Sequence, residues 1–494
     1  MANYLTLQHS VGGIVTAPID PSTTTAPRLN RTRRHRPSAV WRLHVLASAD
    51  PRHVGQVIEL PPGTTVLGRR PDPAASAICI DDALLSRNHA SLTVVGDDTV
   101  AVCDIRSRNG TYANGHKVGS GHVGSGAVLR VGDTVLVLEL DPQLHSGYAR
   151  STAAVPGVSV AARAVRAALH AASADLLPVL LGGETGTGKE LAAVEVHRLS
   201  GRKGPLVRVN VTALPEALFE AELFGHARGA FTGAVAAAPG RFREANGGTL
   251  VLDEIGDLLP TQQPKLLRVI EDRIVRGVGA NVDIALDVKV VASTHIDLPG
   301  AVVAGRFRQD LLARLLGHTV AIPPLRLRRA DLIALADAVR KPRQGFASWS
   351  DALDADVVEL LALAPWRDNL RELRRLLVQL DERLGKTGLG LSDLPDGPWL
   401  EALATQTEPP SAASPGALPL PAPPPRATDP KRHVLSQSPP RADLLALLAQ
   451  HRGDIRLIAE ALHRDRRQIY RWLASAQIGL DVIAAHRSVV ATKD

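Results

Sequence analysis

The sequence predicts a multidomain protein: an all-β sandwich, then an α/β domain with an α-helical extension, then a small all-α domain. Over residues 41–141, short alternating apolar runs are broken by Gly, Asp and Asn, which is typical of sandwich strands. From about residue 158, helices alternate with nearly unbroken apolar runs, which are typical of parallel strands buried on both faces. Residues 326–400 and 441–482 have helical periodicity.

The chain of 494 residues is longer than one hydrophobic core usually organises, and its composition changes along its length. Segments rich in Pro, Thr, Ser and Ala indicate disordered or extended regions between the domains. We expect a disordered basic tail over 1–40, a β-sandwich over 41–141, a linker over 142–157, an α/β domain over 158–325, a helical lid over 326–400, a proline-rich linker over 401–440 and a helical DNA-binding domain over 441–482.

The bulk composition narrows the class of protein. A formal charge of +7 favours an anionic partner such as nucleic acid, although it does not say where that partner binds. The two cysteines, Cys79 and Cys103, exclude a disulfide scaffold and a four-cysteine zinc site, and we expect both to be buried strand thiols. Without a signal-like start or an apolar run of about 20 residues, the sequence predicts a cytoplasmic protein without a membrane segment.

A glycine-rich loop gives the strongest local signal. It lies between the apolar run 179–181 and the helix-like segment 191–198, which is the context of a phosphate-binding loop. Its residues are Gly183, Glu184, Thr185, Gly186, Thr187, Gly188, Lys189 and Glu190. Backbone N–H groups and the helix N-terminus would bind the phosphates of ATP, and Lys189 would reach the β- and γ-phosphates. A glycine-rich turn also arises by chance, so a second feature is needed.

That second feature is a pair of carboxylates at the end of the apolar run 250–252. We expect Asp253 to ligand Mg²⁺ and Glu254 to polarise the attacking water. Two acidic residues after a strand can also be a solvated strand end. Their position downstream of a phosphate-binding loop favours a nucleotide-hydrolysing site.

A series of motifs in collinear order resembles the AAA+ domain of sigma-54-dependent transcription activators. The hexapeptide that contacts the sigma factor in this family is intact, as Gly229, Ala230, Phe231, Thr232, Gly233 and Ala234. The other motifs are Glu222–Arg228, Gly240–Phe242, Gly247–Thr249, Gly305–Leu311, Pro323–Arg326 and Trp366–Leu373. The resemblance covers about residues 155–385. It implies an ATPase that remodels sigma-54 RNA polymerase holoenzyme, and it accounts for Glu190, because the family has Glu after the lysine.

The resemblance also assigns roles to individual residues. Arg308 and Arg314 resemble the arginines that reach the nucleotide of a neighbouring subunit, so a homo-oligomer, from a dimer to a hexameric ring, is implied. Arg371 resembles the sensor II arginine, and Asn210 the residue that restrains Glu254. Phe231 lies among small residues without a strand pattern, so we expect an exposed contact residue.

Three positions depart from the family pattern. His295 stands at the sensor I position, where Asn is usual; Arg276 is shifted by one place in the second surface loop; and Arg367 with Asp368 replaces Pro-Gly before sensor II. Two alternatives therefore stay open: a phosphopeptide-binding scaffold with a weak or inactive ATPase, and an AAA+ remodeller of another client.

Residues 64–140 resemble a forkhead-associated (FHA) domain, a β-sandwich that binds phosphothreonine through its loops. The matching segments are Gly68–Arg69, Ser86–His89, Ser107–Thr111 and Asn114–Gly115. Cations and hydroxyl donors suit a phosphate of charge about −1.5 to −2. The expected phosphothreonine-binding residues are Arg69, Ser86, Arg87, Arg108 and Asn109, whereas His89 is expected to brace the loops. The implied partner is a protein phosphorylated on threonine, or its kinase, and the threonines of the N-terminal tail are a further source of ligand.

Residues 441–475 resemble a Fis-type helix-turn-helix. After two helices with inward leucines and isoleucines, Asp465 would cap a third helix with an outward basic face. The residues expected to contact DNA are Arg466, Arg467, Gln468 and Arg471. Such donors suit a recognition helix in the major groove of double-stranded DNA, here an upstream enhancer bound by a dimer. An amphipathic basic helix can also be only a solvated face.

Overall fold

The computed structural model describes residues 39–72, 76–343, 345–385, 388–395 and 439–451, and some positions between 453 and 482. The predicted tail over 1–40 and the proline-rich linker over 401–440 lie almost entirely outside these residues. Among the helices that the structure describes, none has the length and apolar composition needed to cross a bilayer.

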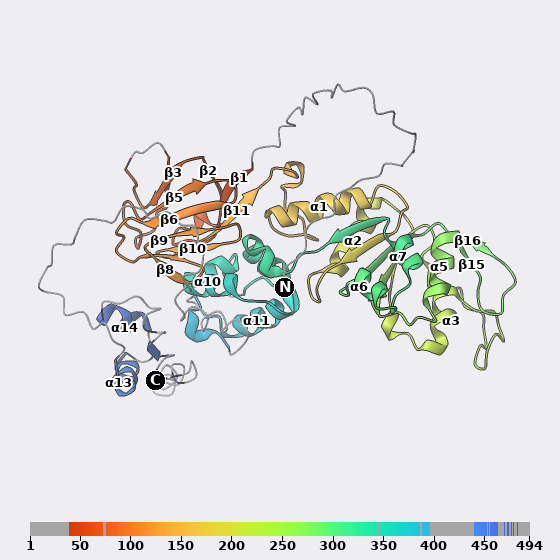
Figure 1. Cartoon of the computed structure of the whole chain (residues 1–494). Helices are drawn as coiled ribbons and strands as arrows, with labels where there is room; N and C mark the ends of the chain where they lie inside the picture. The colour runs from red at the N-terminus through yellow and green to blue at the C-terminus, as the bar shows by residue number, and fades with distance from the viewer. Residues whose placement is uncertain are drawn as a thin grey trace, which may run out of the picture. The chain divides into compact units, whose positions relative to one another are not determined.

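The first domain is the predicted β-sandwich, formed by two antiparallel-rich sheets (Figure 1). One sheet has the order β2-β1-β11-β10-β7-β8 and the other β4-β3-β5-β6-β9. The strands are β1 (Val40–Ala47), β2 (Val57–Leu60), β3 (Thr64–Gly68), β4 (Ala77–Cys79), β5 (Ala90–Val95), β6 (Thr99–Asp104), β7 (Thr111–Ala113), β8 (His116–Val118), β9 (Ser120–Val123), β10 (Val128–Val131) and β11 (Thr134–Asp141).

The burial of both cysteines was predicted wrongly. Val100 and Val102 of β6 point into the sandwich core, and strand alternation therefore turns Cys103 outward. Cys79 follows the buried Ile78 on the edge strand β4 and is exposed for the same reason. Both residues lie in strands as expected, but on the solvent side.

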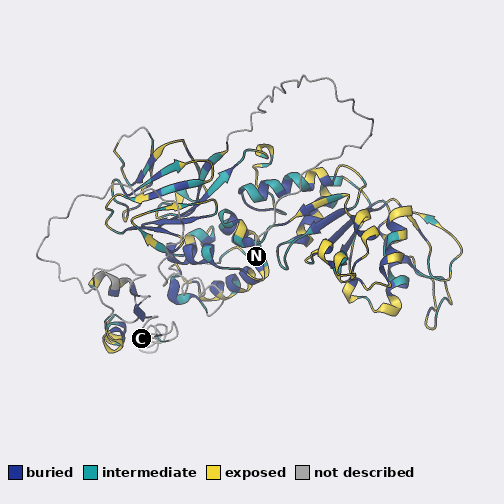
Figure 2. Ribbon diagram, in the orientation of Figure 1, coloured by how far each residue is buried: buried dark blue, intermediate teal, exposed yellow. Residues whose placement is uncertain are grey.

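The second domain contains a five-stranded parallel sheet of order β13-β14-β17-β12-β18. The apolar runs 179–181, 206–209, 250–252 and 288–292, which the sequence predicts as strands, are all present, and β18 completes the sheet. The strands are β12 (Val179–Gly182), β13 (Leu206–Asn210), β14 (Thr249–Asp253), β17 (Lys289–Thr294) and β18 (His318–Ala321). The central strands β12, β14 and β17 are almost entirely buried, which agrees with the prediction that both faces of the sheet are covered, whereas the edge strands β13 and β18 are partly exposed (Figure 2).

Helices cover each face of this sheet. Val251 and Val291 pack on one side with α1 (Val160–Ala172) and α2 (Lys189–Ser200). Leu250 and Leu252 pack on the other side with a second set of helices. That set comprises α3 (Phe219–Phe224), α4 (Arg241–Glu244), α5 (Gln263–Asp272), α6 (Leu298–Val303) and α7 (Gln309–Leu315).

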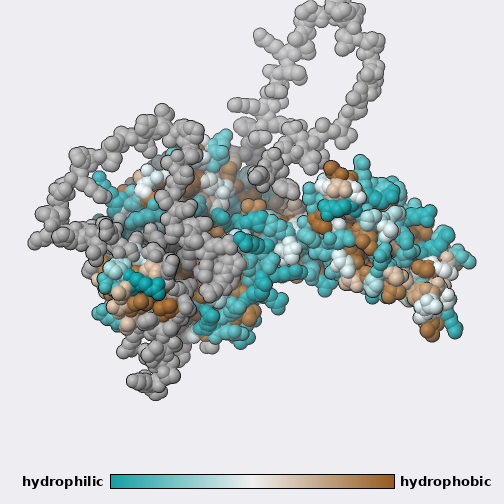
Figure 3. Space-filling view, turned by 60° about the horizontal axis from the view of Figure 1, so that its bottom comes forward, coloured by the Kyte–Doolittle hydropathy of each residue, from teal (hydrophilic) through white to brown (hydrophobic). Residues whose placement is uncertain are grey.

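At one end of the α/β domain, a short hairpin lies beside the loop between α3 and α4. The hairpin pairs β15 (Ile274–Val275) with β16 (Ile284–Ala285). Val235, in the loop between α3 and α4, is 82% exposed, and Val282, between β15 and β16, is 67% exposed. In the space-filling view, hydrophobic residues lie among hydrophilic ones at the right-hand end of the molecule, where this part of the domain lies (Figure 3).

The following segment is helical, with α8 (Leu332–Val339), α9 (Trp349–Ala352), α10 (Ala355–Leu363) and α11 (Asn369–Arg383). Near the C-terminus lie α13 (Arg441–Gln450) and α14 (Ile455–Ala461). Leu444 and Leu448 of α13 pack with Ile455 and Ile458 of α14 in a small core of their own. The four residues predicted to contact DNA, Arg466, Arg467, Gln468 and Arg471, lie outside the described residues.

Candidate functional site

A cavity of about 750 Å³ lies at the carboxyl ends of β12, β13 and β14. It brings together most of the residues predicted to bind and hydrolyse a nucleotide. Its lining includes the backbone of Gly186 and Gly188 and the polar residues Thr185, Thr187, Lys189, Glu190, Arg208, Asn210, Asp253, Glu254, Ser293, Arg371 and Arg374. Val155, Ile322, Leu335, Val339 and Leu370 supply an apolar part. Polar groups beside an apolar wall suit a ligand with phosphates and a base.

The glycine-rich loop has the backbone that a phosphate-binding loop requires. Gly186 and Gly188 have positive φ angles of 78° and 101°. A Cβ atom on Gly186 would also lie 2.2 Å from the backbone oxygen of Asp368, so only glycine fits there. The helix α2 begins at Lys189, and the N-terminus of this helix therefore points into the cavity region that the loop lines.

Lys189 is held by the loop itself. Its Nζ donates hydrogen bonds to the backbone oxygens of Gly183 (2.8 Å) and Glu184 (3.2 Å). Burial lowers the pKa of Lys189 below its ordinary value. A lysine in this position places a cation where the phosphates of a nucleotide would lie.

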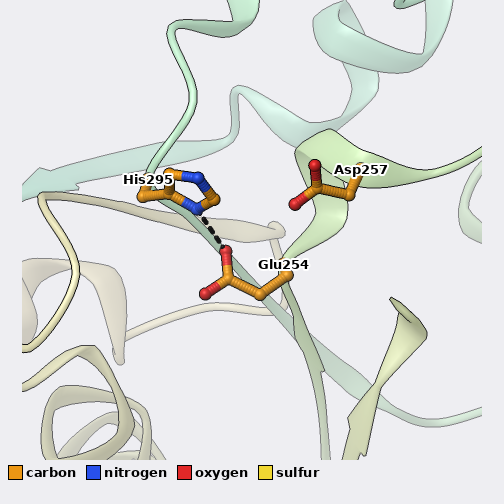
Figure 4. Close-up of side chains that lie close together, drawn as sticks. All are labelled: Glu254, Asp257 and His295. Carbon is orange, nitrogen blue, oxygen red and sulfur yellow. Dashed lines mark hydrogen bonds and ion pairs between the residues drawn. The ribbon is translucent and has the colours of Figure 1, made fainter. Parts of the chain in front are cut away.

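The two predicted carboxylates occupy different surroundings. Asp253 ends β14, and its Oδ1 accepts a hydrogen bond from Ser293 Oγ at 2.8 Å. Burial raises the pKa of Asp253, although the bond from Ser293 opposes the shift. Glu254 follows in the left-handed region with φ 58°, and its Oε2 accepts a hydrogen bond of 2.7 Å from Nδ1 of His295 (Figure 4).

Asn210, predicted to restrain Glu254, lines the cavity, and its side-chain oxygen is bound to Thr212. Its Oδ1 accepts hydrogen bonds from the backbone N–H (3.0 Å) and the hydroxyl (2.7 Å) of Thr212. The partner of Glu254 is His295, which belongs to the neighbouring strand end. His295, and not Asn210, is thus the residue whose side chain is hydrogen-bonded to Glu254 in this structure.

The donors around Asp253 fit Mg²⁺, which prefers one or two carboxylates together with phosphate oxygens and water. Asp253 lines the same cavity as the phosphate-binding loop, whereas Glu190 is exposed and pairs with Arg208 at 3.4 Å. Separately, Glu254, Asp257 and His295 offer ligand atoms that all lie within 4.8 Å of one another (Figure 4). This second set contains the carboxylate expected to activate water.

Two residues that follow the parallel sheet in the sequence, Arg326 and Asn369, form hydrogen bonds with the glycine-rich loop. Asn369, fully buried with φ 52°, donates to the backbone oxygen of Thr185 (3.0 Å) and to Glu184 (3.2 Å), and accepts from Leu325 N–H (2.8 Å). Arg326 forms two hydrogen bonds with Glu184 and thereby lowers the pKa of this carboxyl.

Asn369 was missed as a site residue. Its signal was its place in the Trp366–Leu373 motif, immediately before the leucine and arginine at the start of α11. Sequence spacing shows that it lies near Arg371, but only the fold shows that its side chain joins the loop to this helix.

The candidate phosphate-binding loops of the sandwich also converge. Arg69 N–H donates to the backbone oxygen of Ser86 (3.0 Å), and Arg108 N–H donates to Ser86 Oγ (3.0 Å). Asn109 Nδ2 donates to the backbone oxygen of Leu84 (2.7 Å). Arg87 and Arg108 are exposed beside these contacts. The five predicted residues therefore lie on three adjacent loops, and Asn109 is engaged with its own chain.

Buried polar residues hold these loops in place. His89 is fully buried; it accepts from Ser86 N–H (3.1 Å) and lies 3.2 Å from the backbone oxygen of Gly110, as a bracing residue should. Asp104 accepts from Ser107 and Thr111. Burial raises the pKa of Asp104, but these hydrogen bonds lower it more, and the resulting pKa lies below its ordinary value.

The hexapeptide Gly229–Ala234 forms a tight turn next to the β15–β16 hairpin. Gly229 N–H donates to the backbone oxygen of Ala234 (2.8 Å), while Ala227 N–H donates to that of Val278 (2.9 Å). Phe231 is half-buried, and its ring contacts His226 edge-to-face at 5.0 Å between centroids. Phe231 is therefore less exposed than predicted, because the ring of His226 covers part of its surface.

Comparison with known proteins identifies two domains. Residues 156–321 match the sigma-54 interaction domain, and residues 65–137 match the FHA domain. This chain therefore carries an FHA domain followed by a sigma-54 interaction domain. The latter is an AAA+ ATPase-type domain, which agrees with the cavity and its motifs.

Relatives of the sigma-54 interaction domain are transcription regulators. The Sigma54-dependent transcriptional activator SfnR of Pseudomonas putida is 50% identical over 207 residues, which cover 40% of this chain and 55% of SfnR. The transcriptional regulatory protein ZraR of Klebsiella oxytoca is 45% identical over 44% of this chain and 53% of ZraR. The chain thus spans about half the length of these curated relatives.

Among solved structures, NtrX from Brucella abortus in complex with ADP is 26% identical. The match covers 68% of this chain and 71% of NtrX, with a TM-score of 0.44.

The two arginines expected to act across a subunit interface lie outside the cavity of their own sigma-54 interaction domain. Arg308 precedes α7 and pairs with Asp310, with 49% of its side chain exposed. Arg314 lies within α7 and pairs with Glu271, with 55% exposed. Arg371, in contrast, lines the cavity from α11.

Proposed function

We propose that this protein is a sigma-54-dependent transcription activator that uses ATP hydrolysis to remodel sigma-54 RNA polymerase holoenzyme to the open complex. One observation carries the proposal. A sigma-54 interaction domain holds Lys189, Asp253 and Glu254 around one cavity, and it also keeps the complete Gly229–Ala234 hexapeptide. Nucleotide chemistry and a surface for the sigma factor thus belong to one domain.

In the proposed reaction, ATP binds with its phosphates on the loop Gly183–Glu190, where backbone N–H groups and Lys189 stabilise their charge. Glu254 orients and polarises the attacking water, and it must first leave His295 or share the hydrogen bond with it. Mg²⁺ held by Asp253 would neutralise charge on the phosphate oxygens. Arg371 contacts phosphate from α11, while Asn210 and His295 respond to the nucleotide at the strand ends.

The remaining steps require more than one copy. Arg308 and Arg314 are exposed on α7 and its N-terminal side, where a neighbouring subunit can approach. A cation supplied in trans stabilises the transferred phosphoryl group and is worth about 10³–10⁵ in rate in other systems. This arrangement requires a homo-oligomer, which we propose is a ring of up to six subunits.

The other domains would receive the regulatory signal and bind the protein to DNA. We propose that the FHA domain binds a threonine-phosphorylated protein or its kinase through Arg69, Ser86, Arg87, Arg108 and Asn109. We also propose that a C-terminal helix-turn-helix binds an upstream enhancer in double-stranded DNA through Arg466, Arg467, Gln468 and Arg471. The small helical core of α13 and α14 is compatible with such a domain.

Open-complex formation with purified sigma-54 holoenzyme tests the central proposal. Phe231→Ala should abolish promoter opening while ATP turnover stays within about twofold of wild type. Val235→Ala, at a neighbouring position that is 82% exposed, is the matched control and should open promoters normally. If Phe231→Ala loses ATP turnover as severely as promoter opening, a dedicated coupling role for this loop is excluded.

A second candidate is a phosphopeptide-binding scaffold with a weak ATPase. The hydrogen bond between His295 and Glu254 favours it, because a carboxylate held by imidazole is less available to water. Steady-state ATP turnover at the level of Glu254→Gln would support the scaffold and contradict the ATP-driven activator.

A further inference from the structure

The six-stranded sheet of the FHA domain is apolar on both faces. Along β11, Leu136 and Leu138 point into the sandwich core, while Val135 and Val137 belong to a different cluster. A register shift between Val45 and Ala47 of β1 also turns Ala47 to this outer face. An antiparallel sheet with one solvated face alternates apolar and polar residues. The unbroken run of β11 therefore indicates that the outer face is covered.

The helical segment after the sigma-54 interaction domain provides the cover. Val128, Val135 and Val137 of the sheet form one continuous core with α8, α9 and α10. From these helices, Leu335, Trp349 and Val358 are among the buried residues of this core. Because the cluster is shared, neither the outer sheet face nor these helices would be fully buried without the other.

A buried arginine anchors the contact. The Nε atom of Arg130 on β10 lies 2.8 Å from Glu359 Oε2, and its Nη1 lies 3.2 Å from Asp356 Oδ1, both on α10. All three side chains are at most 5% exposed. The guanidinium group also lies over the ring of Tyr112, 4.6 Å from its centroid. Removing one partner from a buried charge cluster leaves an uncompensated charge, so this geometry specifies one docked arrangement.

The same sheet is tied to the start of the α/β domain. The carboxylate of Glu139 accepts from the N–H of Val160 at the first turn of α1, with both oxygens at 3.0 Å. Asp141 pairs with Arg163 of α1 at 2.7 Å, and Arg329 donates to the backbone oxygen of Gly126 at 2.9 Å. The FHA domain thus contacts both α1 and the helical segment.

These contacts continue to the nucleotide cavity. The connection 364–368 joins α10 to α11, whose first residue, Asn369, donates a hydrogen bond to the backbone oxygen of Thr185 in the glycine-rich loop. The contacts also extend from the docked sheet to the predicted phosphothreonine-binding loops of the FHA domain. Asp82, four residues before Ser86, accepts hydrogen bonds from Asp133 N–H (2.8 Å) and Thr134 Oγ1 (3.1 Å). Arg130 Nη1 donates to Gly132 O at 3.1 Å in that same turn.

We propose that the outer face of the FHA sheet is an intramolecular docking surface for the helical lid, anchored by Arg130 on Asp356 and Glu359, and that docking sets the nucleotide affinity of the motor. Through this surface, binding of a phosphothreonine peptide to the FHA loops can affect the glycine-rich loop of the motor. This second part rests on the proposed phosphothreonine recognition, whereas the docking itself does not.

The test compares full-length wild type, Arg130→Met and Glu359→Gln. Arg52→Met is the matched control, because this arginine of the same domain is 81% exposed. Hydrogen exchange should become at least about tenfold faster in β10, β11 and α10 of both interface variants. The Kd for a fluorescent ADP analogue should change by at least about fivefold, the lower range of typical coupling between sites. Arg52→Met should match wild type in both measurements.

Folded interface variants with wild-type exchange in α10 and wild-type ADP affinity would overturn the proposal. If Arg130→Met does not fold, Glu359→Gln decides the question, since it preserves the shape of the side chain. ADP binding does not require turnover, so an inactive ATPase would contradict the proposed function without affecting this result.

A pool of phosphothreonine peptides tests the route from the FHA loops. The pool should shift the Kd for the ADP analogue in wild type but not in Glu359→Gln. An equal shift in both proteins would show that the signal bypasses the docking surface. A pool that fails to bind would contradict the proposed phosphothreonine recognition, and docking would still be judged by exchange and ADP affinity.

Discussion

His295 departs from the sequence pattern that the resemblance implies, and its side chain is hydrogen-bonded to Glu254. The resemblance to sigma-54 activators implies asparagine at the position of His295, but it does not show which group the imidazole contacts. The left-handed backbone of Glu254 turns its carboxylate toward the end of β17, where His295 lies. A hydrogen bond to a charged group contributes about 1.5–3 kcal/mol, enough to affect the rate.

We expect His295→Asn to raise ATP turnover by about 3- to 10-fold, because Glu254 would lose an imidazole partner that competes with water, and each tenfold corresponds to about 1.4 kcal/mol. Steady-state phosphate release at saturating ATP measures the effect, with Glu254→Gln as the inactive reference. A lower turnover in His295→Asn would mean that the imidazole assists the reaction.

Gly68 shows how closely one residue can constrain the FHA loops. A Cβ atom there would lie 1.8 Å from the backbone oxygen of Arg87. Gly68→Ala must therefore displace the loop that carries Ser86 and Arg87, and we expect phosphothreonine-peptide affinity to fall at least about tenfold, a loss near 1.4 kcal/mol. Gly119→Ala, which meets no atom within 4 Å, should bind as wild type in the same calorimetric titration. Equal affinities in the two variants would contradict the assigned loop.

At the level of elements, the start of α11 is bound directly to the glycine-rich loop. Asn369 places its amide between Thr185, Glu184 and Leu325, and Leu370 N–H donates to Gly186 O at 2.9 Å. The position of this helix therefore depends on the same loop that would bind phosphate. Such a contact lets a small helix movement reach the nucleotide site.

Asn369→Ala removes the side-chain hydrogen bonds that join α11 to the glycine-rich loop and to Leu325. Loss of its buried hydrogen bonds is expected to lower the free energy of unfolding by about 1–3 kcal/mol and to raise the Kd for ATP several-fold. Denaturant unfolding and nucleotide titration measure these effects. Gln379→Ala, at an exposed position on the same helix, is the control and should change neither. Unchanged ATP affinity in Asn369→Ala would show that the loop holds its shape without α11.

At the level of the whole molecule, the proposed ATPase site is incomplete within one subunit. Lys189, Asp253 and Glu254 line the cavity, whereas Arg308 and Arg314 lie outside it with about half of each side chain exposed. If these arginines act on a neighbour, the active unit is an interface between two copies.

Mixing two inactive variants tests this arrangement. Arg308→Ala and Lys189→Ala subunits should each hydrolyse ATP at a few per cent of the wild-type rate or less. An equal mixture should recover a clear fraction of activity, because some interfaces combine an intact loop with an intact arginine. A mixture that gives only the average of the two inactive proteins would assign Arg308 to another role.

The sequence alone determined the β-sandwich followed by the α/β domain, four of the five strands of the parallel sheet and many of the residues that line the cavity, because periodicity and glycine-rich turns are local properties. It could not show that Cys79 and Cys103 face outward, since that depends on strand alternation in the sheet. Nor could it show that Phe231 packs on His226. Only the tertiary structure decided which groups far apart in the chain meet: Glu254 with His295, and Arg130 with Asp356 and Glu359. Such pairings depend on how the elements pack together, and packing between distant segments leaves no periodic trace in the sequence.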